Sequence, residues 1–167
     1  MSGKQNHRSL PRGRALVIGI GNEYRGDDAI GLVVARRLSE SSSGEFTVIE
    51  HDGDGAALME AWQGADMVIA VDAVYSDGEP GTVYRWDAGS QTLQGEAFRG
   101  STHAFSLAEA VELSRTLHQL PPSFVIYGIE GCNFQAGAGV SAEVVTAVPD
   151  VVDRILLEMR GLAHRRS

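Results

Sequence analysis

The chain has 167 residues, of which 43% are hydrophobic and 22% charged, so it can bury one core of ordinary size. Twenty-two acidic residues against 14 basic ones give a formal net charge of -8, which argues against a nucleic-acid binder because that class needs a basic surface. One cysteine excludes an intrachain disulfide, and no apolar stretch approaches the roughly 18 residues of a membrane helix. We expect a cytoplasmic protein that does not contact a membrane.

Five apolar runs alternate with helical patterns along the chain. The first run, 15–20, is rich in β-branched residues and typical of a strand buried on both faces. The alternating fourth run, 82–86, is expected at a sheet edge. Predicted strands cover 15–20, 46–49, 67–71, 82–86 and 124–129. Predicted helices cover 28–38, 56–62, 106–117 and a last region from 141, with a break at Pro149.

This alternation predicts an α/β fold of three layers, a mainly parallel five-stranded sheet with helices on both faces. We expect one domain, residues 15–160, between a flexible basic arm, 1–14, and a flexible tail, 161–167. In such folds ligands bind beyond the carboxyl ends of the strands. The polar residues that follow each strand are therefore the candidates for a functional site.

The loop after the first strand contains a Gly-x-Gly turn and two adjacent acids, Asp27 and Asp28. A dinucleotide site would use such a turn, with Glu50 as the ribose-binding acid. Tyr24 stands where that fingerprint needs its third glycine, and the two acids would repel phosphate. One aspartate is expected to cap the following helix, which leaves the other for a cation or a proton.

Two further polar residues follow strands or precede helices. Asp72 comes directly after the third apolar run, where a buried carboxylate is costly unless it is paired or bound to a metal. A turn-forming aspartate that binds nearby amides is the alternative, and the residues leave both open. His103 lies three residues before a helix-capping pattern at Ser106. His51, in a second polar cluster, competes with His103.

Loops at strand ends can converge, so Asp28, Asp72 and His103 together offer two oxygens and one nitrogen to a divalent ion. Imidazole beside carboxylates suits nickel, zinc or iron, and three protein ligands leave positions open for water or substrate. A different chemistry would use Cys132 as a thiolate nucleophile with His103 as its base. A small buried or half-buried cysteine is the other interpretation of Cys132.

Several segments resemble the signature of the nickel-iron hydrogenase maturation endopeptidases, a family of C-terminal processing proteases. The first is Gly19-x-Gly21-Asn22-x-x-x-Gly26-Asp27-Asp28-Ala29-x-Gly31. The resemblance extends over roughly 15–159 through, in order, Asp52-Gly53-Asp54-Gly55, Val71-Asp72-Ala73, His103, Gly128-Ile129-Glu130 and Ser141-Ala142-Glu143-Val144.

The resemblance implies a five-stranded α/β fold and an aspartyl-type endopeptidase. The implied partner is the precursor of a hydrogenase large subunit, whose C-terminal extension is removed. The family's metal-contacting and catalytic positions carry over to Asp28, Asp72 and His103. Asp28 stands where relatives often have glutamate, so its reach is shorter. The resemblance also implies that the nickel comes with the precursor and that no cofactor is permanently bound.

Two other functions remain open at this point. A non-proteolytic, nickel-dependent docking protein or chaperone would use the same three residues to bind the precursor without cleaving it. A nucleotide-binding oxidoreductase would use the glycine loop 19–31 and would be stabilised by NAD or NADP.

Overall fold

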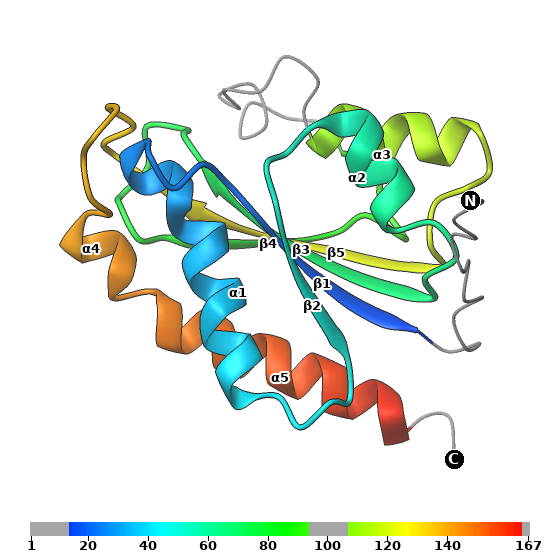
Figure 1. The fold of residues 1–167 in the computed structure, drawn as a ribbon. Coiled ribbons are helices and arrows are strands. Elements are labelled where there is room, and N and C mark those ends of the chain that lie inside the picture. Colours follow the sequence, from blue (N-terminus) through cyan, green and yellow to red (C-terminus); the bar gives the residue numbers. More distant parts are fainter. Residues whose placement is uncertain (1–13, 94–106, 165–167) are drawn as a thin grey trace, which may run out of the picture.

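The computed structural model describes residues 14–93 and 107–164. Five strands form one sheet in the order β2-β1-β3-β5-β4 (Figure 1). Four of them run parallel, and the edge strand β4 runs antiparallel to its neighbour β5. The predicted fold class and the edge position of the fourth strand are therefore confirmed. The bounds are β1 (Ala15–Ile20), β2 (Thr47–His51), β3 (Met67–Val74), β4 (Val83–Asp87) and β5 (Ser123–Glu130).

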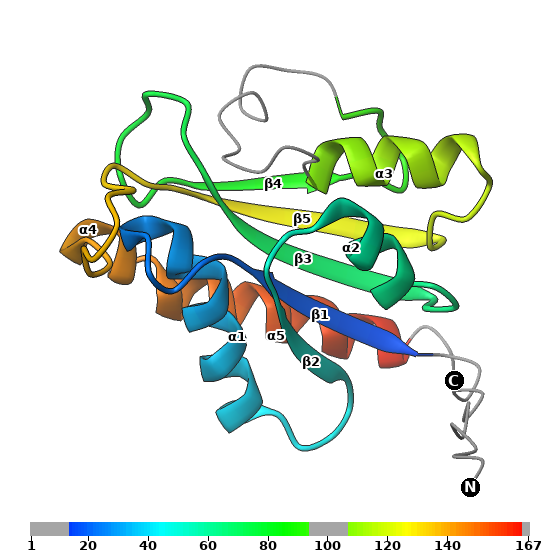
Figure 2. The ribbon, with the colours of Figure 1, turned by 45° about the horizontal axis from the view of Figure 1, so that its top comes forward.

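Helices cover both faces of the sheet, as predicted. Helices α1 (Ile30–Ser41) and α5 (Val148–His164) lie on one face, and α2 (Gly55–Ala61) and α3 (Leu107–Thr116) lie on the other (Figure 2). The short helix α4 (Ala142–Val145) precedes α5. Pro149 occupies the first turn of α5, where its missing N–H is not needed, and the predicted break therefore falls between α4 and α5.

Most strand and helix ends differ from the prediction by one to three residues, and two differences bear on the site and the domain. Helix α5 continues to His164, beyond residue 160 where the domain was expected to end. The helix expected from Asp28 begins instead as a short 3-10 helix, η1 (Gly26–Ala29), and α1 starts at Ile30. No helix of the described residues is long and apolar enough to cross a membrane.

Alternation along the strands divides the core into two clusters, one on each face. Ile69 and Val71 of β3 pack with α1 and α5, whereas Val68 and Ala70 pack with α2 and α3. Successive side chains of a strand point to opposite faces, so Asp72 follows Val68 and Ala70 toward the α2 and α3 face. This alternation fixes the side of the sheet on which the Asp72 carboxylate lies.

Glycines bring the segment after β1 into direct contact with the strands. A Cβ on Gly21 would lie 2.0 Å from the carbonyl oxygen of Asp28. A Cβ on Gly31 would lie 2.2 Å from the oxygen of Ile20 and 2.5 Å from that of Val71. Only glycine fits at such distances from backbone. The glycine pattern of this loop thus has a packing cause, and it places η1 beside the ends of β1 and β3.

Candidate functional site

Carboxylates are concentrated where β1, β3 and β5 end. Five polar or charged residues of the described part are buried, and four of them are acids that lie at or after these strand ends. A buried carboxylate needs compensation from hydrogen bonds, an opposite charge or a metal ion. The four acids, Asp27, Asp28, Asp72 and Glu130, receive that compensation in different ways.

Asp72 lies inside β3, because the strand continues to Val74 opposite β5. The turn interpretation of Asp72 is therefore wrong. Its Oδ1 accepts a hydrogen bond of 2.8 Å from the Ala73 amide, and the residue is 7% exposed. Burial, followed by the charge of Asp28, raises the pKa of Asp72 well above its ordinary value, whereas the Ala73 amide lowers it. The fold thus places this carboxyl where ionisation is unfavourable.

Asp28 lies in η1 and is 4% exposed. Its charge raises the pKa of Asp72, so the two residues lie close to each other. Asp28 comes from the segment after β1, and Asp72 comes from β3. Two close carboxyls in a poorly solvated place favour a shared proton or a bound cation. The pair can therefore share a proton or offer oxygens to a metal ion.

Asp27, the neighbour of Asp28, is held by hydrogen bonds from a distant loop. Its carboxylate accepts hydrogen bonds from the backbone amides of Cys132, Asn133 and Ser141 and from the Ser141 hydroxyl. Burial opposes ionisation of Asp27, but these hydrogen bonds prevail and lower its pKa. Neither η1 nor α1 has a side-chain cap, so the expectation that one aspartate caps the helix is wrong.

Glu130, the last residue of β5, is also engaged by the protein itself. It is 0% exposed and accepts hydrogen bonds from the Ser76 amide, the Ser76 hydroxyl and the Gly78 amide at 2.8–2.9 Å. It closes the turn that follows β3. Sequence reasoning included Glu130 only as part of a family-like motif, since its partners lie 52 and 54 positions away.

The competing candidates have local partners. His51 lies at the end of β2, and its Nδ1 accepts a hydrogen bond from the Gly53 amide at 3.0 Å. Glu50, the ribose-binding acid of the nucleotide hypothesis, pairs with Arg36 at 2.8 Å. Cys132 is exposed, so its interpretation as a buried or half-buried residue is wrong. Its Sγ lies 3.4 Å from the Ser141 hydroxyl.

His103 and Ser106 lie outside the described residues. The helix that follows them, α3, begins at Leu107, which packs in the same cluster as Ala70. That cluster covers the face toward which Asp72 alternates. No group of three His, Cys, Asp or Glu side chains in residues 14–93 and 107–164 has a metal-binding arrangement. The described part thus supplies two oxygen donors, and the role of His103 stays a prediction.

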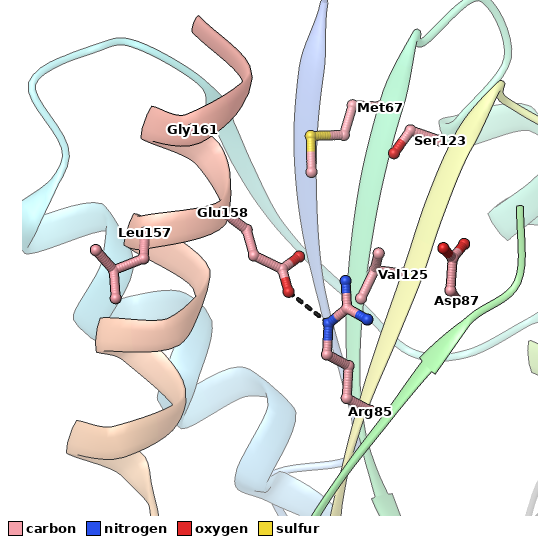
Figure 3. A pocket seen from close by; sticks show the side chains of 8 residues that line it. All are labelled: Met67, Arg85, Asp87, Ser123, Val125, Leu157, Glu158 and Gly161. Carbon is pink, nitrogen blue, oxygen red and sulfur yellow. Dashed lines mark hydrogen bonds and ion pairs between the residues drawn. The ribbon is translucent and has the colours of Figure 1, made fainter. Parts of the chain in front are cut away.

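A surface hollow of about 370 Å³ lies at the opposite end of the sheet (Figure 3). Its lining includes Met67 and Ser123, the first residues of β3 and β5. Arg85 and Glu158 form an ion pair in its wall, and Leu157 beside them is 68% exposed. Neither Asp28 nor Asp72 lines this hollow.

Comparison with known proteins defines the class to which this fold and site belong. The model of the family "hydrogenase maturation protease" matches residues 32–158, and the chain therefore belongs to this family. The family resemblance seen in the motifs is confirmed. Asp72 and His103 fall within the matched segment, and Asp28 precedes it.

Individual relatives agree with this assignment. A curated protein of Methanocaldococcus jannaschii, named "Putative hydrogenase maturation protease", is 28% identical over 151 residues, 87% of this chain and 96% of the relative. The hydrogenase maturating endopeptidase HybD from E. coli superposes with a TM-score of 0.72 at 22% identity, covering 89% and 93% of the two chains. The maturation protease HycI from Thermococcus kodakarensis gives 0.67 at 26%, covering 88% and 92%.

Proposed function

We propose that this chain is an endopeptidase that removes the C-terminal extension of a nickel-iron hydrogenase large-subunit precursor, as the last step of active-site maturation. The observation that carries the proposal is the meeting of two buried carboxyls, Asp28 and Asp72, in a chain of this family. His103 is proposed as the third residue of the site. We expect the reaction to take place in the cytoplasm.

Peptide hydrolysis needs a base that takes a proton from the attacking water and an acid that protonates the departing amine. The raised pKa of Asp72 beside the charge of Asp28 allows a carboxylic acid and a carboxylate to coexist. Such a pair can accept the proton from water and return it to the leaving nitrogen. Either aspartate can be the base, and the proposal assigns both to the catalytic site.

Nickel enters this proposal as part of the substrate. Two carboxylates and one imidazole form an open, anionic donor set that leaves coordination positions for groups of the precursor. Such a set holds an ion weakly until the precursor supplies the ion together with its own thiolates. We therefore propose that the protein keeps no metal of its own and that cleavage depends on correct nickel loading.

Intact-mass measurement on the cognate precursor tests the proposal. The purified protein is mixed with nickel-loaded and, separately, nickel-free precursor, with loading verified before mixing. We expect one C-terminal fragment to be lost from the loaded precursor alone. Binding without any loss of mass would replace the protease by a nickel-dependent docking protein. Equal cleavage of both precursors would keep the protease and remove nickel as the signal.

A further inference from the structure

The carboxylate of Asp27 connects two loops that are far apart in the sequence. Its four hydrogen bonds come from the 131–141 loop between β5 and α4, from residues 105 to 114 positions away. The distances are 2.8 Å from the Cys132 amide, 2.9 Å from the Asn133 amide, and 2.6 and 2.9 Å from the amide and hydroxyl of Ser141. The residue is 0% exposed, so water does not replace these donors.

Backbone contacts reinforce this connection. The Asp27 amide donates to the Asn133 oxygen at 2.8 Å, and the Gly26 amide donates to the Ala138 oxygen at 3.1 Å. Gly26 has a φ of +56°, and a Cβ there would lie 2.2 Å from the Asn133 oxygen. A Cβ on Gly131 would lie 2.9 Å from the Cβ of Asp27. Both loops therefore approach each other closely around one buried carboxylate.

The Ser141 hydroxyl binds Asp27 in place of an ordinary helix-capping hydrogen bond. It is the N-cap residue of α4, a position at which serine commonly binds a backbone amide of its own helix. Here the hydroxyl makes no cap and donates to Asp27 instead. An ionised carboxylate accepts hydrogen bonds only, which matches four donors. The burial and the bonds of Asp27 thus serve the junction between the loops rather than a helix end.

We propose that Asp27 is a positioning residue, whose bonds to the 131–141 loop hold η1 so that the next residue, Asp28, faces Asp72. The consequence for cleavage rests on the proposed function, whereas the mechanical role does not. The chain has little freedom at this point, because Asp28 follows Asp27 directly and its own amide and carbonyl bond to Arg25 and Asn22. Release of Asp27 loosens the short turn that carries Asp28.

The test compares Asp27→Asn with Asp87→Asn. Both changes remove a charge without changing shape, and Asp87 also accepts backbone amide hydrogen bonds, from Gly89 and Ser90, in a turn after the edge strand. In Asp27→Asn, an NH2 group replaces one oxygen of the carboxylate. This group donates hydrogen bonds and cannot accept them, so at least one of the four bonds is lost. The first measurement is amide hydrogen exchange, by NMR on the protein alone, at Asn22 and Asp28. The second is kcat and KM for precursor cleavage below the melting temperature of every variant.

We expect Asp27→Asn to raise exchange at the Asn22 and Asp28 amides at least about 10-fold. We expect it to lower kcat by about 10- to 100-fold with little change in KM, because small errors of position slow the chemical step. Asp87→Asn should change neither. Ser141→Ala, which removes only the hydroxyl bond, should give a smaller change in the same direction.

Two results would overturn the proposal. Unchanged exchange in Asp27→Asn would show that the carboxylate does not hold η1, whatever the cleavage rate. Faster exchange with wild-type kcat would show that the held geometry does not matter for the reaction. Absence of cleavage by the wild-type protein would contradict the proposed function instead, and the exchange measurement would still decide whether Asp27 holds the turn.

Discussion

The acidic pair Asp28–Asp72 and the ion pair Arg85–Glu158 combine charges in opposite ways. At the carboxyl end of the parallel strands, Asp28 and Asp72 are both acids, both buried, and close enough for one charge to raise the pKa of the other carboxyl. On the face of the sheet that α5 covers, Glu158 accepts hydrogen bonds from Arg85 and from the hydroxyl of Tyr127, which pairs with Val71, the neighbour of Asp72. Opposite charges stabilise each other, whereas close like charges cost stability and are common at functional sites.

Burial alone does not distinguish the acids that we propose to react from those that hold the fold together. Asp27 and Glu130 are more deeply buried than Asp72, yet each accepts at least three hydrogen bonds from the protein. Among the described residues, Asp72 accepts one hydrogen bond, from the amide of Ala73, which follows it. The number of donors therefore separates Asp27 and Glu130, which hold loops together, from Asp72, whose carboxyl has one such donor.

The largest effect is expected from Asp72→Asn. Loss of the titratable group should reduce precursor cleavage by about 1,000-fold or more, since proton transfer and electrostatic stabilisation each contribute about 100-fold or more. Stability should rise, because the change removes a buried charge beside Asp28 while its amide oxygen still accepts from Ala73. Intact-mass assays and thermal melts measure the two quantities.

Asp28→Asn and His103→Ala should also abolish cleavage, while Asp87→Asn, at the far end of β4, should leave it unchanged. Near-wild-type cleavage by any folded variant of the three would remove that residue from its proposed role. A lower melting temperature in Asp72→Asn would mean that the carboxyl stabilises the fold, and the contrast between the acidic pair and the ion pair would then be wrong.

A second comparison uses two glycines with opposite surroundings. Gly31→Ala should destabilise the protein by about 3 kcal/mol or more, because the new Cβ would lie 2.2 Å from one backbone oxygen and 2.5 Å from another. Gly161→Ala should stabilise it by about 0.5–1 kcal/mol, since Gly161 lies in α5 and a Cβ there would meet nothing within 4 Å. Urea unfolding measures both changes. Equal effects at the two positions would contradict the packing explanation of the glycine loop.

Most of the fold could be predicted from local patterns. The continuous apolar run gave β1 its observed bounds, Ala15–Ile20, because a strand buried on both faces is marked along its whole length. The local pattern does not predict that β3 extends to Val74. This extension depends on pairing with β5, which continues along β3 beyond Val71, the last residue that pairs with β1. The 3-10 form of η1 was missed as well, because helical spacing does not distinguish its first turn from that of α1.

The candidate site was harder to predict for a related reason. Adjacent acids at 27 and 28 indicated two roles, but the residues around them could not say which acid had which role. The partners that occupy Asp27 come from the 131–141 loop, more than 100 positions away, and only the fold brings them together. Asp72 was found because a carboxylate after an apolar run is an exception to the local pattern.

On the face of the sheet that α5 covers, Glu158→Gln should cost about 1 kcal/mol of stability and leave cleavage within twofold of wild type. The change keeps the shape of the side chain but weakens its bonds to Arg85 and Tyr127. Glu60→Gln, on the exposed side of α2, is the matched control and should change neither quantity. A 10-fold fall in kcat for Glu158→Gln would show that the ion pair and the acidic pair are energetically coupled.

The smallest effect is a pH dependence that comes from Tyr127. Burial, followed by the hydrogen bond to Glu158, raises the pKa of Tyr127 from 10.0 to about 12. The folded state therefore holds the proton more tightly than the unfolded state, and this contribution to stability is complete below pH 10. It declines as the pH rises from about 10 to about 12, because the unfolded chain ionises first.

Tyr127→Phe removes that titration together with the hydroxyl bond of 2.7 Å to Glu158. The variant should be less stable than wild type by about 1 kcal/mol at pH 7, and the difference should shrink as the pH rises above 10. Urea unfolding of both proteins at pH 7, 10 and 11 measures it, and the other tyrosines, being common to both proteins, cancel in the difference. A difference that stays constant over this range would mean that Tyr127 titrates equally in the folded and unfolded chains, so that its contact with Glu158 contributes no pH dependence.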